Sequence, residues 1–287
     1  MSNKAFDMDK EIHWCPGCGN FGLMRSIKET LSDLGAQPWN VAIITGIGQA
    51  AKLPHFMKCH MFNGLHGRYL SNALAVKACN PELTVLAVSG DGCTYSEGGN
   101  HFLHTIRYNP DITNIVSNNQ VYGLTKGQAS PTTHFGYKDT GLYKTTGVYN
   151  EPFNPLAVAI ALGASFVARA YAGDAAGTKE ILKKAMQHRG YALVDVLSPC
   201  VSFNRVNTYR WYKENTYYLD ESHDTFSREQ AMIRALEMKK LPLGIFYLNP
   251  GKPTFEDNTG LYSKDRRPLF KRDVDTAKLE RLMATFK

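Results

Sequence analysis

Short apolar runs, each closed by glycine or by polar residues, alternate along most of the chain with segments of helical periodicity. In segment 20–34, Leu23, Ile27, Leu31 and Leu34 recur at helical spacing. The apolar runs that predict buried strands are 41–46, 83–92, 111–119, 165–171 and 191–199. The segments that predict further helices are 69–79, 95–108, 156–162 and 175–188. This alternation predicts an α/β fold with a doubly wound, mostly parallel sheet.

The alternation ends near residue 200, and the rest of the chain has another character. Residues 204–223 are aromatic and polar, 227–240 fit one more helix, and 249–287 carry many charges and prolines. We predict that this charged end is an arm that wraps a partner subunit. The expected division is an N-terminal cluster-binding loop at 1–19, an α/β domain at 20–203 and a C-terminal extension at 204–287.

Composition narrows the class of protein. Hydrophobic residues make up 43% of the chain and charged residues 21%, as in ordinary globular proteins. The formal net charge of +7 is explained either by a solvated basic surface or by an acidic partner, which would be a protein or an anionic substrate. The basic residues are scattered, so no nucleic-acid partner is expected. No apolar run approaches the roughly 20 residues that cross a bilayer, and we expect no membrane contact. Six cysteines in 287 residues form no dense disulfide framework, and a reducing cytoplasm is expected.

Turns rich in glycine or asparagine follow three of the predicted strands, at 46–48, 90–92 and 118–119. The carboxyl ends of parallel strands meet at one edge of a sheet, where ligands bind, so we expect these turns to cluster. Asp91 and Asn119 then offer a carboxylate and an amide oxygen, which are the ligand types that Mg²⁺ prefers. The glycines let the backbone approach a diphosphate.

A resemblance adds to this interpretation. The turn GDG, followed after 25 residues by NN, resembles the motif of thiamine-diphosphate enzymes. From about Trp14 to Asn204 the chain resembles the β subunit of the 2-oxoacid:ferredoxin oxidoreductases. The resemblance implies a sheet of the thiamine-diphosphate-binding type, which holds the diphosphate half of the cofactor, and a separate α subunit that contacts the pyrimidine. The motifs that carry it are WCPGCG, TGIG, LHGR, GDG, GGNH, YGLTKGQASPT and SPCVSFN.

The resemblance also implies roles for single residues around the cofactor. Asp91, Asn119 and the main-chain carbonyl of Val121 match the Mg²⁺ ligands. The other positions that match or adjoin the cofactor lining are Ile47, Gly48, Gln49, Ala50, His66, Gly92, Cys93, Gly123 and Leu124.

Three residues in or near the cofactor lining are expected to act in catalysis. Lys52 matches a cation that meets the carboxylate of the 2-oxoacid, a role suited to a compact point charge. His66 matches a position that contacts the cofactor or the transition state. Lys52 together with Leu124 resembles members of the family that accept 2-oxoglutarate or a broad range of 2-oxoacids.

The stretch HWCPGCG, residues 13–19, places two thiols at metal-ligand spacing. A zinc ribbon, a redox dithiol and part of an iron–sulfur site all remain open on spacing alone. A zinc ribbon usually needs a second thiol pair or a histidine pair, and a thioredoxin-like dithiol follows a strand. The resemblance implies a [4Fe–4S] cluster bound by Cys15, Cys18 and Cys200.

One ligand of that cluster is in question, because this chain reads GIGQ where the family usually reads GIGC. Gln49 therefore stands at the position of a cysteine. Cys59 is the first candidate to replace the missing thiol, and Cys93 is the second. Alternatively, Gln49 itself or water completes the cluster, or the site is empty or altered.

The activity implied by the resemblance is the CoA-dependent oxidative decarboxylation of a 2-oxoacid, with 2-oxoglutarate the preferred substrate. Electrons would pass through the cluster to ferredoxin, and the reaction could run backwards as the reductive carboxylation of a reductive tricarboxylic acid cycle. Pyruvate or a broad range of 2-oxoacids is the alternative substrate. A non-redox thiamine-diphosphate decarboxylase is the alternative activity, and it would have no use for the two thiols of CPGC.

Overall fold

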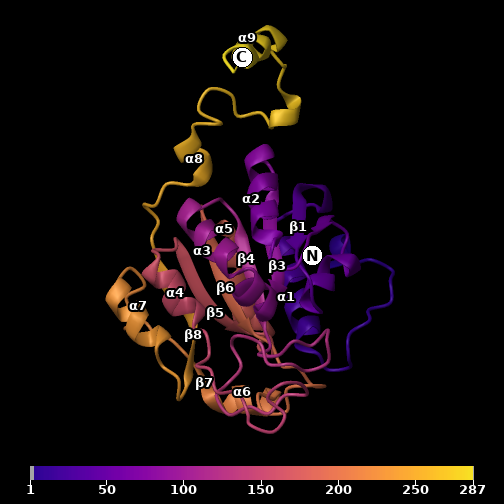
Figure 1. Cartoon of the computed structure of the whole chain (residues 1–287), viewed down its shortest axis with the longest axis vertical. Coiled ribbons are helices and arrows are strands. Elements are labelled where there is room, and N and C mark those ends of the chain that lie inside the picture. Colours follow the sequence, from indigo (N-terminus) through magenta and orange to yellow (C-terminus); the bar gives the residue numbers. More distant parts are fainter. Residues whose placement is uncertain (1–2, 287) are drawn as a thin grey trace.

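The computed structural model describes residues 3–286, and in this part of the chain eight strands form one sheet with helices on both faces (Figure 1). The strands are β1 (Val41–Thr45), β2 (His60–Asn63), β3 (Thr84–Gly90), β4 (Thr113–Asn118), β5 (Phe166–Tyr171), β6 (Ala192–Leu197), β7 (Thr216–Tyr218) and β8 (Leu241–Leu248). Their order across the sheet is β2-β1-β3-β4-β6-β5-β8-β7. Every neighbouring pair is parallel except β5 and β8. The predicted doubly wound, mostly parallel α/β sheet is confirmed.

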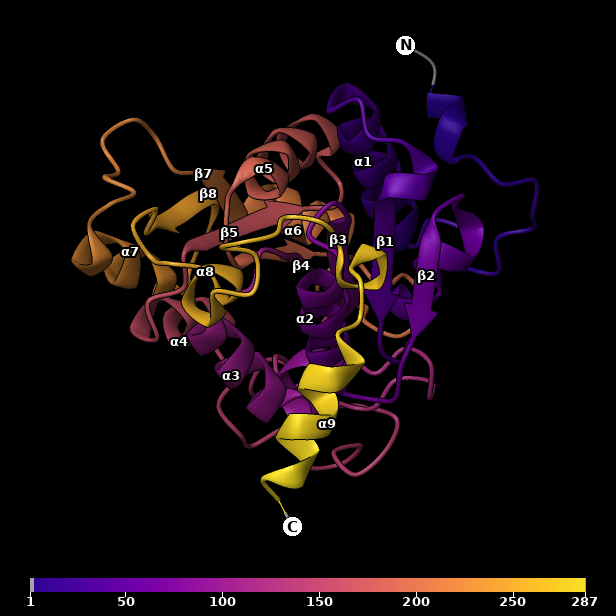
Figure 2. The same ribbon diagram turned by 90° about the horizontal axis from the view of Figure 1, so that it is seen from above.

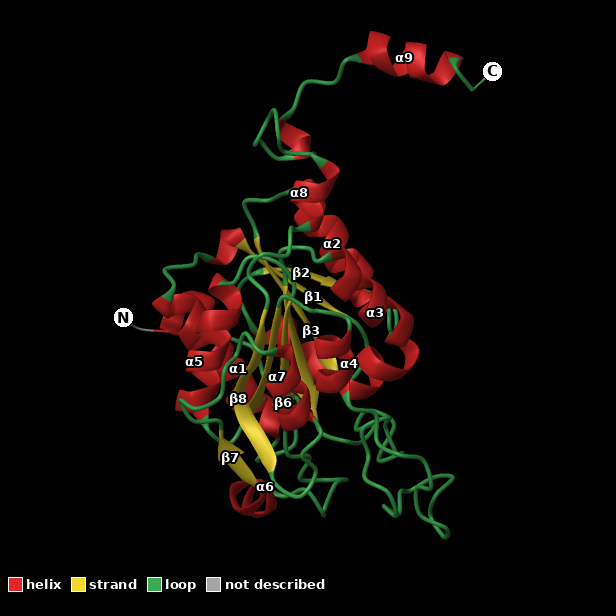
Figure 3. Ribbon diagram, turned by 90° about the vertical axis from the view of Figure 1, so that its left-hand side faces the viewer, coloured by secondary structure: helices red, strands yellow, loops and turns green. Residues whose placement is uncertain are grey.

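The helices form two layers (Figures 2 and 3). On one face, α1 (Gly19–Asp33) and α5 (Ala175–Gln187) pack against the sheet, with the 3-10 helix η3 (Ala50–Phe56) beside them. On the other face the core is closed by α2 (Tyr69–Cys79), α3 (Gly99–Tyr108), α4 (Pro155–Ala161) and α7 (Arg228–Ala235). Because both faces are covered, the central strands are buried on both sides, which explains their continuous apolar runs.

All five predicted strands and all the predicted helices of the first 200 residues are present, with one helix divided. The segment 95–108 splits into a short π-helical turn, η4 (Gly92–Glu97), and α3, with Gly98 between them. A Cβ on Gly98 would lie 2.5 Å from the carbonyl oxygen of Cys93, so this close approach requires glycine.

Three strands were not predicted. β2 is exposed along its whole length and therefore lacks an apolar pattern. β7 has only three residues. β8 follows α7 with the apolar run LPLGIFYL, a signal that Pro242 and Gly244 obscured. Both β7 and β8 belong to the extension 204–287, so the extension completes the edge of the sheet, and the expected division at residues 19 and 203 stays a prediction.

Beyond β8 the chain leaves the body of the protein as an arm (Figures 1 and 3). The arm contains α8 (Phe255–Thr259), the 3-10 helix η5 (Leu269–Lys271) and α9 (Thr276–Ala284), and α9 has no buried residue. The remaining helical elements are η1 (Asn3–Phe6), η2 (Pro38–Asn40) and α6 (Tyr209–Asn215). Among residues 3–286, no helix has the length and apolar character needed to span a membrane.

Candidate functional site

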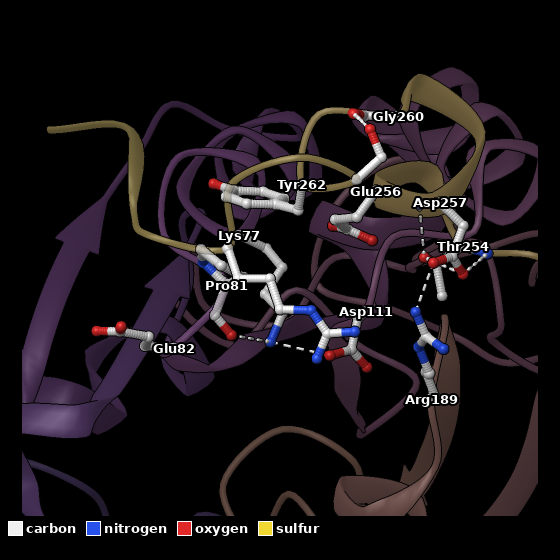
Figure 4. A pocket seen from close by; sticks show the side chains of 12 residues that line it. Lys77, Pro81, Glu82, Asp111, Arg189, Thr254, Glu256, Asp257, Gly260 and Tyr262 are labelled. Carbon is white, nitrogen blue, oxygen red and sulfur yellow. Dashed lines mark hydrogen bonds and ion pairs between the residues drawn. The ribbon is translucent and has the colours of Figure 1, made fainter. Parts of the chain in front are cut away.

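Cavities lie at both edges of the sheet. One, of about 530 Å³, lies at the amino-terminal ends of the strands, beneath the arm (Figure 4). Two ion pairs lie in its wall: Lys77 Nζ lies 2.9 Å from Asp111 Oδ2, and Arg189 Nη2 lies 2.5 Å from Asp257 Oδ1. None of the residues predicted for the site lines this cavity. The residues with candidate chemistry lie at the other edge.

The carboxyl ends of β1, β3 and β4 are neighbours, as predicted. Thr45 at the end of β1 pairs with Val88, and Gly90 at the end of β3 pairs with Ser117 of β4. The turns that leave these strands therefore start side by side. Topology alone explains why segments near residues 47, 91 and 119 meet.

These turns enclose a pocket of about 90 Å³. Every residue predicted to bind the cofactor lines it, so the structure brings together all three turns and the histidine of LHGR. Gly90, Tyr122 and Thr125 also line it and were not predicted. The predicted lining residues are Ile47, Gly48, Gln49, Ala50, His66, Asp91, Gly92, Cys93, Asn119, Val121, Gly123 and Leu124.

Asp91 is a buried carboxylate at the floor of this pocket. Ser130 Oγ donates to Asp91 Oδ2 at 2.5 Å, and Thr132 Oγ1 donates to the same oxygen at 2.6 Å. Burial raises the pKa of Asp91 to about 6, an effect that these hydroxyls only partly offset. None of the ion pairs of residues 3–286 includes Asp91, so no cationic side chain of this part of the chain balances its charge. Ser130 and Thr132 were missed, although the hydroxyl-rich run SPTT was visible in the sequence.

The turn after β4 presents Asn119 to the same pocket. Its Oδ1 accepts a hydrogen bond from the main-chain nitrogen of Val121 at 3.1 Å, and its carbonyl accepts one from Asn204 Nδ2 at 3.1 Å. Gln120 between them has a φ of 58°, in the left-handed region, which turns the chain sharply at this point. Side-chain and main-chain oxygens of this turn are thereby held near Asp91.

Gly92 and Tyr122 form the tightest part of the wall. A Cβ on Gly92 would lie 2.3 Å from Tyr122 Cε1, so only glycine fits beneath this ring. The hydroxyl of Tyr122 donates to Glu97 Oε1 at 3.2 Å, and His66 Nδ1 lies 3.3 Å from Glu97 Oε2. Leu124 also lines this pocket and is 41% exposed.

Lys52 does not line the pocket. It lies in η3, three residues beyond Gln49, and its main-chain nitrogen donates to the carbonyl of Gln49 at 3.3 Å. Its side chain is partly exposed, and none of the ion pairs of residues 3–286 includes it. The ammonium group is therefore free to meet an anion that comes from outside this chain.

A second pocket, of about 60 Å³, shares a wall with the first. Cys15, Cys18 and Cys200 line it together. In the sequence, all the elements from α1 to β6 lie between Cys18 and Cys200. Gln49, with Asn119 and Gly123, lines both pockets.

The approach of the two cysteine segments depends on Gly19. Its main-chain nitrogen donates to the carbonyl of Pro199 at 3.1 Å, which ties the start of α1 to the turn after β6. A Cβ on Gly19 would lie 2.4 Å from Ser198 Oγ and 3.0 Å from the nitrogen of Pro199. Burial raises the pKa of the Cys18 thiol to about 11, with smaller contributions from the nearby Cys200 and Cys15.

Among residues 3–286, no three histidine, cysteine or acidic side chains converge closely enough to hold a single metal ion. The three thiols instead stand around a cavity. Such an arrangement suits a group with several separate iron corners better than a tetrahedral zinc ion, whose four ligands all lie about 2.3 Å from one point.

The other two candidate cysteines lie elsewhere. Cys59 immediately precedes β2, whose first residue, His60, pairs with Ala42 at the start of β1. It therefore lies at the amino-terminal edge of the sheet, against the core, and burial raises its pKa to about 12. Cys93 is buried in the wall of the first pocket, where its Sγ accepts main-chain hydrogen bonds from Gly67 at 3.2 Å and Ile47 at 3.4 Å. The structure brings neither thiol to the pocket of the other three cysteines.

Comparisons with known proteins bear on this geometry. A family described as thiamine pyrophosphate enzyme, C-terminal TPP binding domain, matches residues 44–196. A second family, which describes the C-terminal part of the pyruvate ferredoxin oxidoreductase β subunit, matches residues 200–264. The first match spans both glycine turns of the cofactor pocket, and the second begins at Cys200.

Individual relatives agree with these matches. A 2-oxoacid:ferredoxin oxidoreductase subunit beta of Saccharolobus solfataricus is 42% identical over 257 residues, covering 85% of this chain and 84% of the relative. A 2-oxoglutarate synthase subunit KorB of Methanocaldococcus jannaschii is 34% identical, covering 79% of this chain and 86% of the relative. A solved 2-oxoglutarate:ferredoxin oxidoreductase from Magnetococcus marinus, with 2-oxoglutarate, coenzyme A and succinyl-CoA bound, superposes with a TM-score of 0.90 at 33% identity. That alignment covers 98% of this chain and 96% of the solved one.

Proposed function

The chain belongs to the β subunits of the thiamine-diphosphate-dependent 2-oxoacid:ferredoxin oxidoreductases, and from this premise we propose that its substrate is 2-oxoglutarate. The proposed reaction is oxidative decarboxylation to an acyl-CoA and CO₂, reversible as reductive carboxylation, with electrons passed to ferredoxin. The observation that carries this proposal is the pair of adjoining pockets. One has the oxygen ligands of a metal–diphosphate site, and the other, behind the same wall, has three thiols.

The first pocket fits Mg²⁺ and the diphosphate of thiamine diphosphate. Asp91 is buried without a cationic partner, and Asn119 and the carbonyl of Val121 supply neutral oxygens beside it. Ser130 and Thr132 hold the carboxylate in one orientation. Thiamine diphosphate, when bound, supplies the electron sink for the decarboxylation. The role of this chain is to anchor its diphosphate end and to keep water out of the buried side.

Lys52 is proposed to bind the distal carboxylate of the 2-oxoacid, because its ammonium group has no anionic partner among the described residues. Lys52→Ala is expected to raise the KM for 2-oxoglutarate by about 10- to 100-fold, since a charge-assisted hydrogen bond contributes roughly 1.5–3 kcal/mol. The KM for pyruvate, which has no distal carboxylate, should change much less. Steady-state kinetics on both acids check this, with Lys58→Ala as a control at an exposed lysine of the same region. An equal loss on both acids would leave Lys52 without a selective role.

The second pocket is proposed to hold a [4Fe–4S] cluster bound by Cys15, Cys18 and Cys200. Thiolates are the ligands that iron–sulfur clusters require, and three of them line one cavity here. Asn119 and Gly123 form the wall between this cavity and the cofactor pocket, so an electron has only a short distance to cross. A redox dithiol formed by Cys15 and Cys18 alone would make no use of Cys200.

Ferredoxin is proposed to dock through electrostatic attraction, because this chain carries a net charge of +7 and ferredoxins are usually acidic. We expect kcat/KM for ferredoxin to fall by about tenfold between low and high ionic strength, as screening shortens the range of the attraction. The same titration with a neutral dye acceptor should change the rate little. A ferredoxin rate that does not depend on salt would contradict the steering of ferredoxin by this charge.

The arm is proposed to contact the α subunit or the second copy of the assembly. Its last helix, α9, buries nothing against the body and exposes Leu279, Leu282 and Met283. Exposed apolar side chains on a detached helix usually mark an interface between chains.

The proposed function is tested on the complex purified without oxygen together with its α subunit. Iron, acid-labile sulfide and bound thiamine diphosphate are measured per β subunit, with EPR spectra before and after reduction. About four iron and four sulfide ions per β subunit, together with bound thiamine diphosphate, would support the proposal. Bound thiamine diphosphate without iron would exclude the electron path and favour a non-redox decarboxylase.

A further inference from the structure

Gln49 combines two properties at the thiol pocket, which is the cavity lined by Cys15, Cys18 and Cys200. It lines this pocket together with the cofactor pocket. Its Oε1 is buried, and no hydrogen-bond donor of the described residues reaches it. A buried amide oxygen without a hydrogen-bond partner destabilises the fold, so an occupant of the pocket that takes this oxygen as a ligand would remove the cost.

The position of Gln49 is determined by the segment that carries the first cysteine. Trp14 Nε1 donates to the carbonyl of Gln49 at 2.9 Å, and Trp14 directly precedes Cys15. The indole is itself packed edge-on against Phe21 and Phe56, with ring centroids 5.3 and 5.1 Å apart. Gln49 and Cys15 are therefore held together by a rigid aromatic cluster.

We propose that Gln49 faces the one iron of the cluster that no thiolate of this chain binds, with its Oε1 as a weak, neutral ligand. This inference rests on the proposed function, since it requires a cluster in the thiol pocket. A cubane has four iron corners, and Cys15, Cys18 and Cys200 supply three thiolates. An amide oxygen binds iron less strongly than a soft, anionic thiolate does, so the fourth iron is differentiated from the others and is easily lost.

The geometry disfavours the two other thiols as the fourth ligand. Cys59 lies at the opposite edge of the sheet, beside the start of β1. Cys93 lines only the cofactor pocket, and its sulfur already accepts two main-chain hydrogen bonds. The consequence of a neutral ligand is electrostatic as well: one negative charge fewer around the cluster raises its reduction potential relative to a cluster with four thiolates.

The test compares the wild-type complex with Gln49→Cys and Gln49→Leu, all purified without oxygen with the α subunit. Each sample is treated with ferricyanide, a one-electron oxidant, and released iron is followed together with EPR spectra. Ferricyanide takes one electron per cluster and becomes ferrocyanide; the differentiated iron then leaves as Fe²⁺, and a [3Fe–4S] cluster remains. Wild type should lose about one iron in four and show the EPR signal of a three-iron cluster.

The variants should move in opposite directions. Gln49→Cys should retain all its iron under the same treatment and show a lower reduction potential, while Gln49→Leu should lose the fourth iron about tenfold faster than wild type. Cys59→Ser is the matched control and should behave like wild type. Bound thiamine diphosphate is measured in every sample, so that damage to the shared wall is recognised.

Two results would overturn the inference. One is a wild-type cluster that keeps all its iron under ferricyanide and matches Gln49→Cys. The other is a fourth iron that leaves faster in Cys93→Ser than in wild type, while Gln49→Leu loses it at the wild-type rate. A failure of the proposed function looks different, because the untreated complex would then contain bound thiamine diphosphate and no iron, and Gln49 would have no cluster to face.

Discussion

Asp91→Asn is expected to abolish the binding of Mg²⁺ and with it the retention of thiamine diphosphate. Asp91 is proposed to be the only charged side chain among the metal ligands, and a neutral amide cannot replace that charge. Loss of a residue that merely supports a ligand costs about 10- to 100-fold in metal affinity, so loss of the anionic ligand itself should cost at least about 100-fold. Turnover should fall in proportion to the cofactor that is lost.

Although Asp91→Asn is expected to weaken cofactor binding, it should make the cofactor-free protein more stable against unfolding. Burial raises the pKa of Asp91 to about 6 in the folded, cofactor-free protein. Above this pH the buried carboxyl is ionised in the folded protein, although its ionisation is more favourable in the unfolded chain. This costs stability at pH 8, and the cost disappears as the pH falls below about 4, where the carboxyl is protonated in both states. The cofactor-free variant should therefore be more stable than wild type by about 3 kcal/mol at pH 8 and equal to it near pH 3.

Calorimetric titration with Mg²⁺ and thiamine diphosphate, and thermal unfolding of the cofactor-free complex, check the two halves of this prediction. Asp174→Asn is a suitable control, because Asp174 caps α5 away from both pockets and asparagine caps helices equally well. Unchanged Mg²⁺ affinity in Asp91→Asn would remove Asp91 from the metal site, whatever happens to stability.

Gly19→Ala is expected to empty the thiol pocket while the cofactor pocket stays intact. The added Cβ would lie 2.4 Å from Ser198 Oγ and 3.1 Å from Pro199 Cδ, and Pro199 is a rigid neighbour that cannot give way. The start of α1 must therefore move away from the turn after β6, which separates Cys18 from Cys200. Because a cluster needs its thiolates at set distances, we expect iron per β subunit to fall by about tenfold.

Bound thiamine diphosphate should remain near the wild-type level in Gly19→Ala, since Ser198 and Pro199, which the added methyl group meets, make no hydrogen bond to Asp91 or Asn119. Electron transfer to ferredoxin should be lost with the iron. Gly99→Ala is the matched control: Gly99 has no positive φ, and nothing lies within 4 Å of an added Cβ. Full iron content in Gly19→Ala would show that the two cysteine segments need not meet as closely as they do in this structure.

The pattern of the chain by itself determined the repeated strand–turn–helix units, because a strand covered on both faces must be apolar throughout and must end in a turn. It also determined that the Asp91 and Asn119 turns are neighbours, since parallel strands linked by helices place their carboxyl ends at one edge. The same reasoning could not detect β2, whose residues are exposed and carry no pattern. In the sequence Cys59 ranks first as a substitute for the missing cluster ligand because it lies ten residues beyond Gln49, and only β2 shows that those ten residues carry it to the opposite edge of the sheet.

Only the tertiary structure decided which side chains meet across long stretches of sequence. The loop after β4 returns so that the hydroxyls of Ser130 and Thr132 reach Asp91, although nothing local to that loop requires it. The same holds for Gln49, which lines the pocket of Cys18 and Cys200 while its main-chain carbonyl accepts a hydrogen bond from an indole 35 residues earlier. Such meetings depend on packing between elements, which periodicity does not encode, because periodicity records only which face of an element is buried.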